Sequence, residues 1–191
     1  MKDRHELNDT HSHERRFHGG PERLRSPDRI ARLDISGVIG LSLDGLAVAS
    51  VLDVGTGTGV FAEAFVAAGL VVTGVDINAD LLSVAREFVP AAQFNIAPAE
   101  DLPFADASFD LVFLGHVLHE ADDLQVALQE ARRVARSRVA VLEWPYRDEP
   151  HGPPLAHRLQ PAALVDLAIK AGFQGVEVSH LEHMDLYRLT P

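Results

Sequence analysis

The sequence predicts an α/β fold in which seven strands form one mostly parallel sheet between two layers of helices. From residue 46 onward, short runs rich in β-branched residues alternate with longer stretches whose apolar residues recur at helical spacing. Such alternation requires crossover connections, which give neighbouring strands the same direction. Only residues 180–183 fall near the turn between the last two strands, so the final strand is expected to be antiparallel.

The expected strands are short apolar runs, at residues 47–54, 71–75, 93–96, 109–115, 138–144, 175–178 and 184–189. The expected helices of this region cover residues 60–68, 79–88, 121–135 and 161–171. The proline-rich stretch 145–160 is expected to be a loop. This order is typical of a Rossmann-like, doubly wound, three-layer α/β/α domain, in which ligands bind at the carboxyl ends of the strands.

The chain is expected to divide into an arm, a short helical segment and the main domain, at residues 1–20, 21–45 and 46–191. Residues 1–20 are polar, which predicts a flexible N-terminal arm. His11 and His13 lie in this arm and are interpreted as part of a solvated tail, so no metal site is expected.

Composition excludes several classes of protein. The chain of 191 residues carries a formal net charge of −11 and has no cysteine, which removes disulfides, thiolate metal sites and cysteine nucleophiles. No apolar run approaches the ~18 residues of a membrane span. The beginning of the sequence shows no secretory signal, and a cytoplasmic location is expected. The acidity argues against a nucleic-acid surface.

The most informative segment is a glycine loop between the first strand and its helix. Gly55, Gly57 and Gly59 let the chain turn tightly and let a ligand approach the backbone. Asp53 precedes the loop and suits an ammonium or sulfonium group better than a pyrophosphate. Asp76 ends the second strand, where an acid can accept both hydroxyls of a ribose. Each acid has a structural alternative: Asp53 could bond loop N–H groups, and Asp76 could cap the next helix.

Three segments in order resemble a known family. VLDVGTGTG at 51–59, VTGVDIN at 72–78 and AEDLPFADASFDLVFLGHVLHEADD at 99–123 are similar to the motifs of class I S-adenosylmethionine-dependent methyltransferases. The similarity is to the ubiquinone/menaquinone-biosynthesis-like Methyltransf_11 type and spans roughly residues 46–144. It implies a Rossmann-like fold and S-adenosylmethionine as methyl donor, with S-adenosylhomocysteine as product.

The resemblance also implies a set of cofactor-binding residues at the ends of the first four strands. Carried over by position, they are Asp53, Gly55, Thr56, Gly57, Gly59, Asp76, Ile77, Ala99, Glu100, Gly115 and His116. One departure concerns the adenine: many relatives have an acid at the position of Pro98. Either Glu100 replaces that acid, or its hydrogen bond to the adenine is absent.

Residues beyond the fourth and fifth strands are candidates for the chemistry. His116 is the candidate general base, because histidine titrates near neutral pH; alternatively it bonds the cofactor or the loop. His119, Glu143 and Tyr146 are candidate substrate contacts. His119 could instead begin the next helix, and Glu143 could pair with an arginine.

Residues 21–45 are expected to cover the cofactor cleft as a helical lid, as similar arms do in the family. The positive charges of this segment could steer an anionic acceptor or could form a solvated helix face. They come from Arg23, Arg25, Arg29 and Arg32.

The expected function is therefore S-adenosylmethionine-dependent methylation of a small molecule, with no nucleic-acid partner, no membrane span and a homodimer left open. Two alternatives remain at this point: a non-catalytic S-adenosylmethionine-binding sensor or partner subunit, and an NAD(P)-binding oxidoreductase. The dinucleotide motif would need its third glycine one residue after Gly59, which disfavours the oxidoreductase.

Overall fold

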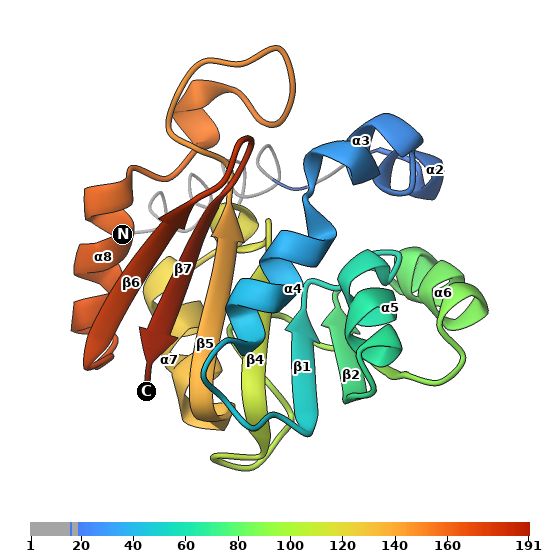
Figure 1. Cartoon of the computed structure of the whole chain (residues 1–191), viewed down its shortest axis with the longest axis horizontal. Helices are drawn as coiled ribbons and strands as arrows, with labels where there is room; N and C mark the ends of the chain where they lie inside the picture. The colour runs from blue at the N-terminus through green and yellow to red at the C-terminus, as the bar shows by residue number, and fades with distance from the viewer. Residues whose placement is uncertain (1–15, 17–18) are drawn as a thin grey trace, which may run out of the picture.

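The computed structural model describes residue 16 and residues 19–191, and its centre is a seven-stranded sheet (Figure 1). The strands lie in the order β3-β2-β1-β4-β5-β7-β6. β7 is antiparallel to β5 and β6, and the other pairs are parallel. Their bounds are β1 Ser50–Val54, β2 Val71–Asp76, β3 Gln93–Ile96, β4 Phe109–Gly115, β5 Ala135–Glu143, β6 Gly175–His180 and β7 Asp185–Thr190. The predicted α/β fold class with an antiparallel last strand is confirmed.

Helices cover both faces of the sheet. They are α2 Pro21–Leu24, α3 Pro27–Arg32, α4 Ile35–Leu43, α5 Val60–Ala67, α6 Ala79–Phe88, α7 Leu124–Val134 and α8 Pro161–Lys170, with 3₁₀ turns at Leu118–Glu120 and Leu155–His157. In β1, Leu52 and Val54 pack with α7 and α8, whereas Val51 packs with α4, α5 and α6. Alternate side chains thus point to opposite faces, which is why this buried strand is apolar throughout.

Two strand starts differ from the prediction. β1 begins at Ser50 instead of residue 47, because the Asp110 carboxylate accepts the N–H groups of Ala49 and Ser50 at 2.9 and 3.0 Å. β5 begins at Ala135 instead of residue 138, since it follows α7 directly and Ala135 already pairs with Phe109 of β4.

The start of α7 also differs: the helix begins at Leu124 instead of residue 121. Asp123 is its N-cap, and its side chain accepts from the N–H groups of Gln125 and Val126 at 2.9 and 3.1 Å. The other ends agree with the prediction to within two residues.

The parallel strands end at one edge of the sheet, and two segments lie over that edge. Figure 1 shows α2 and α3 on one side of it and the loop between β5 and α8 on the other. Residues 21–45 contain α2, α3 and α4, and their role as a lid stays a prediction. No helix in the described part of the chain has the length and apolar character that a membrane crossing needs.

Candidate active site

A cavity of about 850 Å³ lies at this edge of the sheet, within the usual size of a small-molecule site. The glycine loop and the ends of β2, β3 and β4 line one half of it. Residues of α3 and of the loop after β5 line the other half, and Leu24 of α2 reaches the glycine loop. The predicted site residues among its lining are Asp53, Gly55, Thr56, Gly57, Asp76, Ile77, Ala99, Glu100, Gly115, His116 and His119.

The conformation of the glycine loop is fixed by contacts with neighbouring segments. Gly55 has φ +66°, and a Cβ atom there would lie 2.4 Å from Cγ2 of Val117. The N–H of Thr56 donates to the carbonyl of Val75 at 2.9 Å, which ties the loop to β2. Gly59, also at positive φ, is the N-cap of α5. Only glycine at position 55 allows this close approach of the backbone to the next loop.

Asp76 fixes the loop from the other side. Its carboxylate accepts from the N–H groups of Gly57 and Asn78, both at 2.8 Å. The N-cap of α6 is Asn78, so the alternative that Asp76 caps this helix is wrong. Burial raises the pKa of the Asp76 carboxyl.

Asp53 is the second acid beside the loop, and it is 2% exposed. Its side chain accepts a hydrogen bond from the Thr56 hydroxyl at 2.6 Å. Burial raises its pKa to about 7, although the Thr56 bond opposes this, and the nearby Asp76 raises it further. A buried carboxyl whose pKa is raised is stabilised in its charged form by a cation, so this end of the cavity favours an ammonium or sulfonium group.

The end of β3 leads into the segment 97–100, which also lines the cavity. Oε1 of Glu100 accepts from the N–H groups of Asp122 and Asp123 at 2.7 and 3.2 Å. This oxygen therefore holds the start of α7, and Pro98 offers no N–H group. Ile77 is 48% exposed at the end of β2, where an apolar ring could cover it.

His116 follows β4 and is buried. Its φ of +60° is rare for a residue with a Cβ atom. The ring lies 4.8 Å from the Trp144 ring at 31°, and Nε2 lies 2.9 Å from Sδ of Met184. Nδ1 is buried and has no hydrogen-bond partner. Burial lowers the His116 pKa well below its usual value, so the imidazole stays neutral.

His119 and Glu143 form a buried pair. His119 Nδ1 lies 2.8 Å from Glu143 Oε2, and the His119 backbone N–H donates to Oε1 at 3.1 Å. The Trp144 N–H donates to the same carboxylate at 3.3 Å. His119 lines the cavity and Glu143 does not, so Glu143 orients His119. Contact of either residue with a substrate stays a prediction.

Tyr146 lies outside the cavity lining. It is 41% exposed, and its hydroxyl accepts from Gln160 at 3.2 Å. Its predicted role as a substrate contact stays untested, and this arrangement does not favour it.

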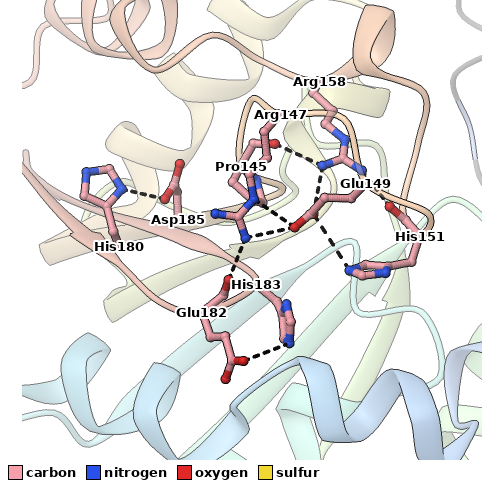
Figure 2. A network of polar contacts seen from close by, with 9 residues as sticks. All are labelled: Pro145, Arg147, Glu149, His151, Arg158, His180, Glu182, His183 and Asp185. Carbon is pink, nitrogen blue, oxygen red and sulfur yellow. Dashed lines mark hydrogen bonds and ion pairs between the residues drawn. The ribbon is translucent and has the colours of Figure 1, made fainter.

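The loop after β5 contributes lining that the sequence did not reveal: His151, Gly152, Pro153, Pro154 and His157. Figure 2 shows how Arg158 holds this loop. Its guanidinium donates to the carbonyls of Pro145, His151 and Pro153 and to the Glu149 carboxylate. The prolines indicated a loop, but no local signal showed that Arg158 would be buried at its centre.

Figure 2 also shows a contact between Glu149 and His151, whereas His183 contacts Glu182. Ligand atoms of Glu149, His151 and His183 lie within 4.8 Å of one another, a group that could approach a metal ion. Both oxygens of Glu149, however, already accept from arginines: Oε1 from Arg147 at 2.8 Å and Oε2 from Arg158 at 3.1 Å. This group therefore clamps the loop. His11 and His13 lie outside the described residues.

Comparisons with known proteins agree with this geometry. Residues 52–142 match the Methyltransf_11 family, described as a methyltransferase domain. The chain is 38% identical over 87 residues to a demethylmenaquinone methyltransferase of Chlorobaculum parvum, covering 45% of this chain and 36% of that protein. It is 40% identical over 92 residues to a malonyl-[acyl-carrier protein] O-methyltransferase of Erwinia pyrifoliae, covering 48% and 35%. The match thus spans little more than a third of these relatives.

Among solved structures, an S-adenosylmethionine-dependent methyltransferase from Aquifex aeolicus has the same fold. Its TM-score is 0.75 at 21% identity, over 90% of this chain and 98% of that one. The matched region contains the glycine loop and both acids that line the cavity. Residues 52–142 of this chain therefore match a Methyltransf_11 methyltransferase domain, and the fold around them is that of S-adenosylmethionine-dependent methyltransferases.

Proposed function

We propose that this chain binds S-adenosylmethionine in the half of the cavity formed by the strand ends and transfers its methyl group to a small molecule. Asp53 carries the argument: a carboxyl that is 2% exposed, with a pKa raised to about 7, lies beside a glycine loop. A ligand that brings a positive charge to this position offsets the cost of burying the carboxylate.

The other residues at this edge suit the rest of the cofactor. Asp76 is held by two backbone N–H groups, and its remaining acceptor capacity can take ribose hydroxyls. Ile77 and Ala99 would lie against the adenine, with the main chain near Glu100 beside it, whereas Gly59 lies outside the cavity lining. The order of the sheet, with β7 inserted antiparallel, differs from the dinucleotide-binding order 3-2-1-4-5-6. This difference supports the methyltransferase over the oxidoreductase.

At the methyl end, the main task of the residues is to bind and orient the methyl acceptor, and activation of the acceptor is secondary. The cofactor supplies an electrophilic methyl group on a sulfonium. His116 and Gly115 line the cavity at this end, and a neutral imidazole can accept the proton of an acceptor hydroxyl or amine. Alignment of donor and acceptor supplies most of the rate, because positioning alone can be worth ~10⁵ M or more in effective concentration.

Calorimetry of S-adenosylhomocysteine binding to the whole chain tests the proposal. Asp76→Ala should weaken binding by about 30-fold or more, since it removes charge-assisted hydrogen bonds. Asp80→Ala is the matched control: Asp80 is an exposed acid in the first turn of α6, and its loss should change the affinity by less than about twofold.

A folded wild-type chain that binds neither S-adenosylmethionine nor S-adenosylhomocysteine would refute the proposal. Release of S-adenosylhomocysteine from S-adenosylmethionine with a panel of acceptors separates an enzyme from a binding module. A cytoplasmic location, a homodimer and the absence of a nucleic-acid partner stay predictions.

A further inference from the structure

Two arginines of the lid face the cavity without a partner. Arg29 and Arg32 lie one turn apart on α3, and both line the cavity. The Nε atom of each is buried and makes no hydrogen bond. Neither side chain forms an ion pair within 4.0 Å in the described part of the chain. A buried Nε donor without an acceptor costs free energy, and each guanidinium has four further donors that a ligand can use.

Arg29 and Arg32 are not needed to hold the lid in place, because Arg25 of the same segment anchors it. Arg25 donates to the carbonyl of Thr58 at 2.7 Å and pairs with Glu63 at 2.8 Å. Its guanidinium also lies 3.7 Å from the centre of the Phe88 ring. One arginine thus anchors the lid to α5 and α6, and two others are left for the cavity.

Charge is divided between the two halves of the cavity. The acids Asp53 and Asp76 lie at the glycine loop, whereas Arg29 and Arg32 line the cavity together with His116 and His151. Burial lowers the pKa of His116, and the charge of Arg29 lowers it further. Burial lowers the pKa of His151 too, and the charge of Arg32 adds to this. Both arginines therefore lie within electrostatic reach of the acceptor half.

Glu120 is the acid that acts on Arg29. Its charge raises the Arg29 pKa, but burial outweighs it and the pKa falls below the usual value. Glu120 nevertheless leaves the Nε donors of both arginines without a hydrogen bond, so an anion beside both guanidinium groups would still find free donors. Arginine suits this task because its planar fork binds carboxylate or phosphate oxygens in pairs.

We propose that Arg29 and Arg32 bind an anionic group of the methyl acceptor, which makes the acceptor a small organic acid that carries a carboxylate or a phosphate. The inference rests on the proposed function, because it takes the second half of the cavity as the acceptor site. Although the chain has a net charge of −11, these two cations attract an anion locally to the cavity.

The test uses the whole chain saturated with S-adenosylhomocysteine and three probes of similar shape: benzoate, phenyl phosphate and the neutral benzamide. At least one anion should bind 10-fold or more tightly than benzamide. The tighter of the two anions identifies the group that the pair of arginines prefers. Equal binding of benzamide and both anions would overturn the proposal.

Variants then locate the anion. Arg29→Gln and Arg32→Gln should each weaken the preferred anion at least 10-fold and leave S-adenosylhomocysteine binding within twofold. Arg132→Gln is the matched control: Arg132 of α7 is also half-buried with an unpartnered Nε, but it lies outside the cavity lining. Undiminished anion binding by both lid variants would contradict the assignment.

Two readouts keep the outcomes separate. The thermal midpoint of Arg29→Gln should equal or exceed that of the native chain, because the variant removes an unpaired charge; a purely structural role would lower it. If the native chain fails to bind S-adenosylhomocysteine, the proposed function fails. Anion selectivity is then measured on the chain alone, and its dependence on Arg29 and Arg32 still decides the subsite.

Discussion

Two carboxylates at the same edge of the sheet differ in what surrounds them. Asp53 near the end of β1 and Glu143 at the end of β5 are each 2% exposed. The Glu143 carboxylate accepts from two groups of His119 and from the Trp144 N–H. Asp53 accepts a side-chain bond from Thr56, and its pKa rises to about 7. Asp53 and Glu143 are thus equally buried, but the protein satisfies Glu143, whereas Asp53 has a raised pKa.

The comparison extends to the two halves of the cavity. In the cofactor half, the protein leaves an acid with too few donors and brings it close to a second acid. Behind the other half, Glu143 does not line the cavity and is satisfied by His119 and Trp144, whereas Arg29 and Arg32 line the cavity with an unpartnered Nε each. A titratable group at a strand end therefore indicates a ligand when its own fold does not satisfy it.

The largest expected effect concerns the loop that sets the cofactor half. Gly55→Ala should weaken S-adenosylhomocysteine binding ~100-fold or more in calorimetry, because the new Cβ would lie 2.4 Å from Val117 Cγ2 at φ +66°. Gly69→Ala is the control, since Gly69 has φ +85° and nothing within 4 Å of an added Cβ. If both variants bind alike, the close approach to Val117 does not shape the site.

A middle-sized effect should separate the two acids. Glu143→Gln places an amide NH₂ where the carboxylate accepted from His119 and Trp144, and should lower the free energy of unfolding by about 1–3 kcal/mol. S-adenosylhomocysteine affinity should stay within about twofold after this change. Chemical denaturation and calorimetry measure the two quantities. A large loss of affinity with unchanged stability would place Glu143 in the cofactor half.

The smallest expected effect concerns the anchor of the lid. Arg25→Met keeps the apolar stem but removes the bonds to Thr58 and Glu63, and should cost about 1 kcal/mol of stability. Limited proteolysis should cut residues 21–45 faster in this variant. Arg23→Met, at an exposed position of α2, should leave the cleavage rate unchanged. Identical rates for both variants would mean that Arg25 does not hold the lid.

The cofactor half could be predicted from the sequence because its signals are local. Gly55, Asp53 and Asp76 lie within a strand–loop–helix–strand unit, and the parallel sheet brings the two acids together without further information. The apolar runs likewise predicted all seven strands. The start of β1 was wrong because a distant side chain, Asp110, takes the N–H groups of Ala49 and Ser50.

The acceptor half could not be predicted in the same way, because its contacts join distant parts of the chain. The pair of His119 and Glu143 and the burial of Arg158 depend on how the loop after β5 folds back. The interpretation of His116 as a base that titrates near pH 7 also needs revision. Burial keeps its imidazole neutral, which leaves it a weak acceptor of protons.

Asp53 is proposed to bind the positively charged group of the cofactor, and the pH dependence of S-adenosylhomocysteine binding tests this most directly. The ammonium group of the ligand should keep the Asp53 carboxylate charged. Without the ligand, burial raises the Asp53 pKa to about 7, so binding below that pH must release the Asp53 proton. From Asp53 alone, affinity should rise about eightfold between pH 6.0 and 7.5, with proton release visible in buffers of different ionisation enthalpy. Asp53→Asn should remove the rise. A native affinity that is flat, or that falls as pH increases over this range, would contradict the account.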